Sequence, residues 1–179
     1  MGWRYRVGQF LGRLGARPTD EDLRLASEVL PPKALALFRT MAPGDQRHSL
    51  RVLRRLRGEG HCGPILEQAA LLHDVGKAGA GLTLAHRSLT VILERVAPAF
   101  LQRLAGPAPR GWRRPFHAHL HHAEIGAARV AEAGCDPLVV ALVRYHDRGA
   151  WPEGLAAWQA DLDALRRALG QAFPDRRLR

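Results

Sequence analysis

The apolar positions of this chain are spaced for helices. Leu50, Leu53 and Leu56 follow one another at intervals of three, and residues 84–105 form a longer apolar segment that includes Leu89 and Ile92. Apolar residues at helical intervals line one face of an α-helix. The alternation of apolar and polar residues that is typical of strands is nowhere sustained. We therefore expect an all-α protein.

Capping residues, prolines and glycines predict where the helices begin and end. Thr19 and Asp22 form a capping-box pattern, and Pro32 and Pro64 suit the first turn of a helix. Residues 43–45, Pro-Gly-Asp, predict a turn followed by an N-cap. Gly76 and Gly134 are expected to end helices. The predicted helices cover about residues 2–14, 19–30, 32–41, 45–58, 64–75, 84–105 with a kink at Pro98, 115–133, 137–146 and 155–173.

The chain of 179 residues is expected to form one compact helical domain. We assign residues 45–170 to that domain, residues 1–44 to an N-terminal helical extension packed on it, and residues 171–179 to a basic tail. No run of about 18 uncharged apolar residues occurs, so we expect no transmembrane span. The widely separated Cys62 and Cys135 and the lack of a signal-peptide pattern predict a cytoplasmic protein.

The charge balance predicts an anionic partner. Lysine and arginine number 27 against 17 acidic residues, a formal charge of +10, and only Lys33 and Lys77 are lysines. This surplus suits phosphate esters, nucleotides, nucleic acid or an anionic membrane face; a bias toward arginine codons is the alternative explanation. The basic residues 2–14 and the apolar residues 84–105 raise the prospect of peripheral membrane contact. Packing in the core is the simpler account of the second segment.

The strongest chemical signal lies in residues 71–77, Leu-Leu-His-Asp-Val-Gly-Lys. His73 and Asp74 stand at the end of an apolar run, where burying an imidazole and a carboxylate is costly unless something pairs with them. A divalent cation is the simplest partner, because both groups ligate borderline and hard metals. The alternative is a helix end with an ion-paired aspartate and a hydrogen-bonded core histidine.

Nine histidines are a surplus for a chain of this length, and four of them lie within residues 117–122. On a helix, His117 and His121 share one face, and His119 and His122 share another. Paired imidazoles on one helix face commonly present ligands to a metal. For each of the four, an ordinary polar helix face is the alternative.

The order of these residues resembles the HD superfamily of metal-dependent phosphohydrolases. His48, then His73 with Asp74, and then the distant Asp161 follow that family's order, and the resemblance covers roughly residues 45–168. It is closest at residues 69–77, Ala-Ala-Leu-Leu-His-Asp-Val-Gly-Lys. Residues 122–127, His-Ala-Glu-Ile-Gly-Ala, and residues 141–147, which end in Arg-Tyr-His-Asp, resemble segments that carry two further histidines in members with two metals.

The resemblance implies an HD-domain fold and one or two divalent ions, with Asp74 as the bridging ligand if two ions bind. Imidazole and carboxylate ligands suit Mn²⁺, Fe²⁺, Co²⁺, Ni²⁺ or Zn²⁺ better than Mg²⁺. The chain departs from the family's cyclic-dinucleotide phosphodiesterases, because it lacks their paired histidines and their Gly-Tyr-Pro signature. This departure argues against a cyclic-di-GMP enzyme. The implied metal ligands are His48, His73, Asp74, His122, His146 and Asp161.

The resemblance also implies hydrolysis of a phosphoester or phosphoanhydride bond, with Asp74 and Lys77 as catalytic residues. We expect a small phosphorylated, nucleotide-type substrate, because arginine forks beside Trp112 suit phosphates and a base. An ordinary basic surface loop is the alternative for these arginines. The alternatives for the whole protein are a nucleic-acid phosphodiesterase and a non-catalytic module that binds metal and nucleotide. The predicted substrate-binding residues are Lys77, Arg110, Arg113 and Arg114.

Overall fold

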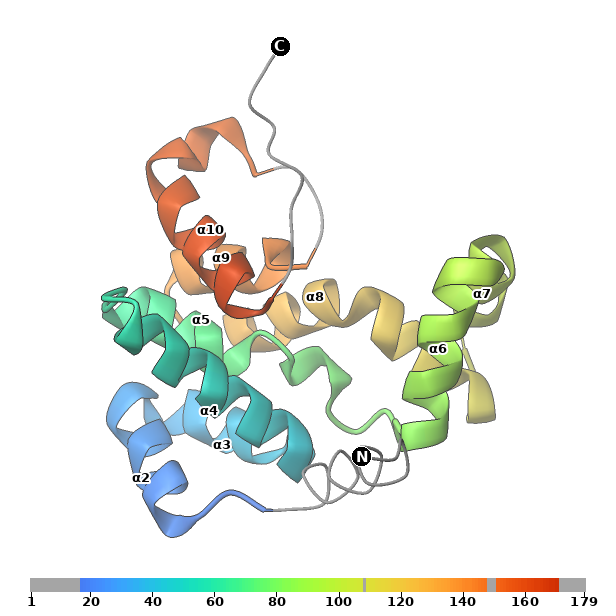
Figure 1. The fold of residues 1–179 in the computed structure, drawn as a ribbon, viewed down its shortest axis with the longest axis horizontal. Helices are drawn as coiled ribbons and strands as arrows, with labels where there is room; N and C mark the ends of the chain where they lie inside the picture. The colour runs from blue at the N-terminus through green and yellow to red at the C-terminus, as the bar shows by residue number, and fades with distance from the viewer. Residues whose placement is uncertain (1–16, 108, 148–150, 171–179) are drawn as a thin grey trace, which may run out of the picture.

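The computed structural model describes residues 17–107, 109–147 and 151–170, and in these ranges the protein is all-α, as predicted (Figure 1). Three short 3-10 helices connect the α-helices: η1 (Val75–Lys77), η2 (Gly111–Arg113) and η3 (Glu153–Trp158). The predicted N-terminal helix and the basic tail lie outside the described residues. The α-helices are α2 (Asp20–Val29), α3 (Pro32–Arg39), α4 (Pro43–Gly58), α5 (Pro64–Leu72), α6 (Leu84–Val96), α7 (Pro98–Ala105), α8 (Arg114–Glu132), α9 (Pro137–Tyr145) and α10 (Gln159–Ala168).

Several helix ends follow directly from local sequence. The capping box predicted for α2 is present, with the amide of Asp22 donating to Thr19 Oγ1 at 3.2 Å and the amide of Thr19 donating to the Asp22 carboxylate at 2.9 Å. Gly134 follows the end of α8 with a φ of 78°. The prediction of a turn at residues 43–45 is wrong, because α4 already begins at Pro43. Proline suits that position since a first-turn amide has no partner within the helix.

Two predicted helices are shorter than expected. Residues 84–105 form α6 and α7, which are separated at Ala97, whose φ of −150° and ψ of 57° are not helical. Pro98 lacks an amide hydrogen and disfavours the helical conformation of the residue before it, so the chain breaks where a kink was predicted. The last predicted helix begins later, at Gln159, after η3, in which Leu155 leaves helical geometry.

One hydrophobic core joins the first and the last described helices. Phe38 of α3, Leu53 of α4, Leu71 of α5, Leu142 of α9 and Leu165 of α10 all belong to it and are completely buried. The described part of the predicted N-terminal extension therefore shares its core with the rest of the body. None of the described helices combines the length and the apolar character needed to cross a bilayer.

Helices α6 and α7 stand beside this body, at the right of Figure 1, and we call residues 84–114 the α6–α7 lobe. The lobe packs on the first half of α8 through a small core of Leu101, Ala105 and Phe116. Helix α8 leaves helical geometry at His121, with φ −114° and ψ 15°. The irregular residue separates the half of α8 that carries the lobe from the half that packs in the main core.

The outer side of the lobe contradicts one prediction. Packing in the core was the simpler account of the apolar residues in 84–105. However, Val91, Ile92 and Val96 of α6 are 62%, 56% and 71% exposed. The prediction fails because α6 packs mainly against α7 and α8, which cover only its inner side.

Candidate metal centre

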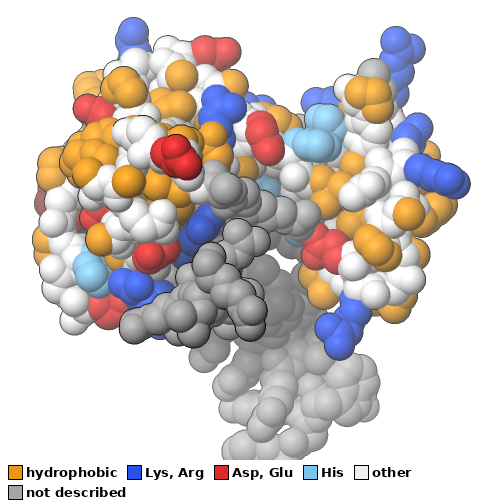
Figure 2. Space-filling view, turned by 90° about the horizontal axis from the view of Figure 1, so that it is seen from above, with side chains coloured by type: hydrophobic (Ala, Val, Ile, Leu, Met, Phe, Trp, Pro, Cys, Tyr) orange, Lys and Arg blue, Asp and Glu red, His pale blue; other side chains and the backbone are white. Residues whose placement is uncertain are grey.

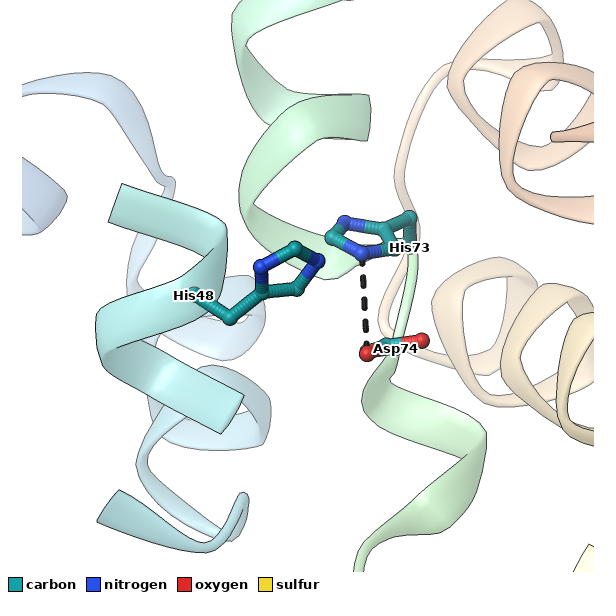
Figure 3. A group of neighbouring side chains, drawn as sticks. All are labelled: His48, His73 and Asp74. Atoms are coloured by element: carbon teal, nitrogen blue, oxygen red, sulfur yellow. Dashed lines mark ion pairs between the residues drawn. The ribbon is translucent and has the colours of Figure 1, made fainter. Parts of the chain in front are cut away.

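Four helices bring five of the predicted metal ligands together. His48 projects from α4 toward His73, which follows the last residue of α5, and Asp74 is next in the chain (Figure 3). His122 comes from the middle of α8, and His146 directly follows α9. His48 is half-buried, and the other four side chains are buried. Residues far apart in the sequence thus form one enclosed polar site.

The five side chains form two groups that share Asp74. His48, His73 and Asp74 make the first group, and Asp74, His122 and His146 make the second. Within each group, one nitrogen or oxygen atom of every residue lies within 4.8 Å of the others. His73 Nε2 is 3.6 Å from Asp74 Oδ2, and His122 Nε2 is 3.6 Å from Asp74 Oδ1. Each carboxylate oxygen therefore faces one group, which is the geometry that a bridging ligand requires.

Two glycines allow α8 to approach the aspartate. A Cβ at Gly76 would lie 2.0 Å from the carbonyl oxygen of His122, and a Cβ at Gly126 would lie 3.2 Å from the amide nitrogen of Gly76. The prediction that Gly76 ends the helix is wrong, because α5 ends at Leu72 and Gly76 lies inside η1 without a positive φ. Glycine is needed there because the backbones of η1 and α8 touch. This contact places His122 beside Asp74.

Backbone carbonyl groups select the tautomer of three histidines. Nδ1 of His73, His122 and His146 lies 2.9, 2.7 and 2.7 Å from the carbonyl oxygen of the residue three positions earlier. A carbonyl oxygen only accepts, so each Nδ1 carries the hydrogen, and Nε2 of each neutral ring has a free lone pair. All three Nε2 atoms are therefore available as metal ligands.

The arrangement of these Nε2 atoms fits a bound cation. His122 Nε2 and His146 Nε2 are 3.2 Å apart, and the buried His73 Nε2 has no hydrogen-bond partner among the described residues. Two lone pairs at that separation repel each other, and an unpaired buried nitrogen costs about 1–3 kcal/mol. A divalent ion would satisfy these atoms and offset the charge of Asp74. Imidazole and carboxylate donors favour transition metals or zinc over Mg²⁺.

Burial holds the ligands in the protonation states that metals bind. It lowers the pKa of His73 to about 3 and the pKa of His122 to about 4, and it also lowers the pKa values of the other two histidines. Burial by itself would raise the pKa of Asp74, but attraction by His73 and Lys77 holds that pKa well below its usual range. Near neutral pH the site therefore presents neutral imidazoles and an ionised carboxylate, which are the metal-binding forms.

Lys77 lies beside the shared carboxylate. Its Nζ is 2.6 Å from Asp74 Oδ1, and its side chain is 15% exposed. Lys77 belongs to η1 rather than to a continued α5, so a tight 3-10 turn, and not the i, i+4 spacing from His73, brings it to the site. An ammonium group thus stands next to the ligands at a point that solvent reaches.

Asp161 and Arg113 lie apart from the two groups. Asp161 is half-buried in the first turn of α10 and belongs to neither group of described ligands, so its assignment as a ligand stays a prediction. Arg113 donates to the carbonyl oxygen of Leu104 at 2.9 Å and to that of Arg103. Its guanidinium therefore ties η2 to the end of α7.

The other two predicted substrate-binding arginines are not next to the ligands either. Arg110 is exposed in the loop before η2. Arg114 lines a cavity of about 130 Å³ together with His117 and Arg129, and no candidate metal ligand lines that cavity. The roles of Arg110, Arg113 and Arg114 in substrate binding stay predictions.

Two contacts near the site escaped the sequence reasoning. His119 Nε2 is 3.4 Å from Glu94 Oε1, which links α6 to α8 one turn before His122. Arg166 of α10 donates to the carbonyl oxygen of Tyr145 at 2.7 Å, directly before His146. The i, i+3 spacing of His119 and His122 placed both residues on one face of a helix, but it did not identify Glu94 as the partner of His119. No local pattern marks Glu94 or Arg166, because each acts through a distant part of the chain.

Comparisons with models of protein families, with curated proteins and with solved structures find no match for this chain. The all-α fold and the buried histidine–aspartate groups are established by the structure itself. What these groups do chemically must therefore be inferred from their own geometry.

Proposed function

We propose that this protein is a metal-dependent phosphohydrolase of the HD superfamily that cleaves a phosphoester or phosphoanhydride bond in a small, nucleotide-type molecule. The observation that carries the proposal is the Asp74 carboxylate, whose two oxygens each face a separate group of histidines. Two metal ions that share a carboxylate suit displacement at phosphorus. The order of His48, His73, Asp74, His122 and His146 along the chain, which resembles that superfamily, supports the same chemistry.

The protein's own contribution is to prepare the ligands. His48, His73 and Asp74 would hold one ion, and Asp74 with His122 and His146 would hold a second. Such an ion, when bound, lowers the pKa of a coordinated water and polarises a phosphoryl oxygen. Burial keeps the imidazoles neutral, and the carbonyl groups bonded to Nδ1 orient the rings and increase the basicity of Nε2.

Lys77 would bind the anionic substrate. Its ammonium group pairs with Asp74 Oδ1 at 2.6 Å, and a cation that shares this carboxylate would leave the ammonium group available to a phosphate oxygen. The formal charge of +10 attracts anions over longer distances. Phosphate esters therefore fit the site better than neutral esters do.

A screen for phosphate release tests the proposal. Full-length protein is stripped with a chelator and then assayed with nucleoside phosphates, dinucleoside polyphosphates and a simple phosphodiester, with Mn²⁺, Co²⁺, Ni²⁺, Zn²⁺ or Mg²⁺ added. We expect activity only with metal, and a loss of at least about a hundredfold in metal affinity and rate for Asp74→Asn. Asp20→Asn, at an exposed aspartate in the first turn of α2, is the matched control and should retain both.

The same assays distinguish the alternatives. Cleavage of RNA or DNA, with binding that weakens steeply as salt rises, would indicate a nucleic-acid phosphodiesterase. Uptake of metal and nucleotide without product would indicate a binding module. Full activity and full metal content in Asp74→Asn would show that the proposal is wrong.

A further inference from the structure

The exposed large apolar side chains of the described residues all lie in the α6–α7 lobe. Their exposed fractions run from 44% for Leu89 to 71% for Val96. None of them belongs to the small core of Leu101, Ala105 and Phe116 through which the lobe packs on α8. The exposed set is Leu89, Val91, Ile92, Val96, Phe100 and Trp112.

The apolar stripe of α6 faces away from the protein. Leu89, Ile92 and Val96 follow one another at i, i+3 and i+7, and all three are exposed, whereas the polar Thr90 is completely buried. A helix on the surface of a globular protein normally turns its apolar stripe toward the core. The reversed orientation leaves this stripe available to a partner outside the chain.

The lobe is also strongly basic. Residues 84–114 contain six arginines and one acidic residue, Glu94, which gives a formal charge of +5, half of the total for the chain. Glu94 is within 3.4 Å of His119 on α8, so it is engaged by the protein itself. The lobe therefore combines exposed apolar surface with positive charge.

Arginines and apolar side chains alternate over the surface of the lobe. Arg95 follows Val91 and Ile92 at i+4 and i+3, and Arg103 follows Phe100 at i+3, and each of these residues is exposed. Residues at these spacings are neighbours on a helix. Figure 2 shows basic groups at the rim of the right-hand lobe and apolar groups between them. This mixture is typical of helices that lie in the interface of a membrane.

We propose that the α6–α7 lobe docks on a bilayer that contains anionic phospholipids. The aliphatic side chains of α6 enter the boundary between headgroups and acyl chains, and the arginines contact lipid phosphates. Long arginine side chains can lie along the apolar surface while their charged ends reach the headgroups. Trp112 is of the residue type that prefers the headgroup level.

Charge complementarity distinguishes a bilayer from the other possible occupants. A second copy of the chain would bring two lobes of like charge together. Residues 1–16 contain three arginines and no acidic residue, so they would also repel the lobe. A nucleic acid would attract the arginines but would leave the valine, leucine and isoleucine side chains in water. An anionic bilayer matches both the charge and the apolar surface.

Vesicle cosedimentation of the full chain tests the proposal. We expect binding to phosphatidylcholine vesicles that contain phosphatidylglycerol, no binding to phosphatidylcholine alone, and weaker binding as salt rises. Ile92→Asp/Val96→Asp and, separately, Arg95→Glu/Arg103→Glu should each weaken binding by roughly tenfold or more. Emission from Trp112 should shift to shorter wavelength on binding, and Trp112→Phe should lose that shift.

Matched controls come from exposed positions on the body. Ala36→Asp/Ala131→Asp on α3 and α8 and Arg24→Glu/Arg39→Glu on α2 and α3 introduce the same charges and should retain vesicle binding. Circular dichroism melting verifies that every variant folds. Absence of binding, or equal binding to neutral and anionic vesicles, would overturn the proposal. So would a dimer that Ile92→Asp/Val96→Asp converts to monomer while vesicle binding stays unchanged.

Discussion

Helices α5 and α6 are both rich in apolar residues, but they use them in opposite ways. The apolar residues that precede His73, from Ala69 to Leu72, are completely buried, and α5 packs against α2, α3, α4, α9 and α10. Helix α6 packs mainly against α7 and α8, and its Ile92 and Val96 face solvent. The spacing of apolar residues thus defines a face of a helix, whereas the neighbouring helices determine whether that face is buried.

The polar residues of the two regions show the same contrast. In the body, four histidines lie around one aspartate, burial lowers the pKa values of the histidines, and carbonyl groups select the tautomers of three of them. In the lobe, Arg95 and Arg103 are exposed and lie beside apolar side chains. The body therefore encloses groups that could hold a metal ion, and the lobe presents an exposed surface that is both apolar and basic.

Replacing one phenylalanine in the body and one in the lobe should give the largest difference in the free energy of unfolding. Phe38→Ala removes a completely buried side chain and should lower the free energy of unfolding by about 3–5 kcal/mol. Phe100 is 53% exposed, and Phe100→Ala should change that free energy by less than about 0.5 kcal/mol. Urea unfolding followed by circular dichroism measures both. A similar loss for the two variants would mean that the lobe is packed as the core is.

Glycine substitutions probe the contact that brings α8 to the site. Gly76→Ala would place a Cβ 2.0 Å from the His122 carbonyl oxygen, so we expect a loss of about 3 kcal/mol in unfolding free energy together with weaker metal binding. At Gly58, the last residue of α4, a Cβ would meet nothing within 4 Å, so Gly58→Ala should be neutral or stabilising by up to about 1 kcal/mol. Unfolding and metal titration measure both effects. Normal metal affinity in a folded Gly76→Ala protein would contradict this role.

Acid should destabilise the metal-free protein through its buried histidines. His73 and His122 have folded-state pKa values of about 3 and about 4, below the value of about 6.5 in an unfolded chain. Between about pH 6.5 and about pH 5.5 the unfolded chain takes up protons that the folded protein does not, so stability falls as pH falls. We expect a loss of about 1 kcal/mol from each of these two histidines, and His48 and His146, whose pKa values burial also lowers, should add to it. Asp74 contributes nothing in this window, because its pKa lies well below its usual range and it stays ionised.

Melting curves recorded in chelator at several pH values measure this loss. His122→Asn should reduce this loss by about 1 kcal/mol. Added Mn²⁺ should raise the melting temperature in a concentration-dependent manner, because metal binds the folded site. A melting temperature that rises on acidification would contradict burial of neutral histidines.

The smallest expected effect concerns the attachment of η2 to α7. Arg113→Ala removes hydrogen bonds to the carbonyl oxygens of Leu104 and Arg103 and should cost about 1 kcal/mol. Arg110→Ala, at an exposed arginine of the same loop, should have no measurable effect on stability. Hydrogen exchange should show faster exchange in α7 for Arg113→Ala alone. Equal exchange rates in the two variants would contradict a structural role for Arg113.

The sequence by itself determined the helical class and many helix ends. The capping box at Thr19 and the prolines that begin α3 and α5 act within one turn of backbone, so local pattern is sufficient to predict them. It also identified His73 and Asp74 as a costly polar pair after an apolar run. The family resemblance named the other predicted ligands, of which His48, His122 and His146 lie beside this pair and Asp161 does not, but it could not supply distances or hydrogen-bond partners.

Only the tertiary structure decided how those side chains meet and which faces remain exposed. Asp74 lies between two groups of histidines because Gly76 and Gly126 allow η1 and α8 to touch, a contact between residues far apart in the chain. The stripe of α6 is exposed because no described helix covers it. Burial, tautomer and pKa all depend on what surrounds a group in space, and spacing along one helix contains no information about partners from another.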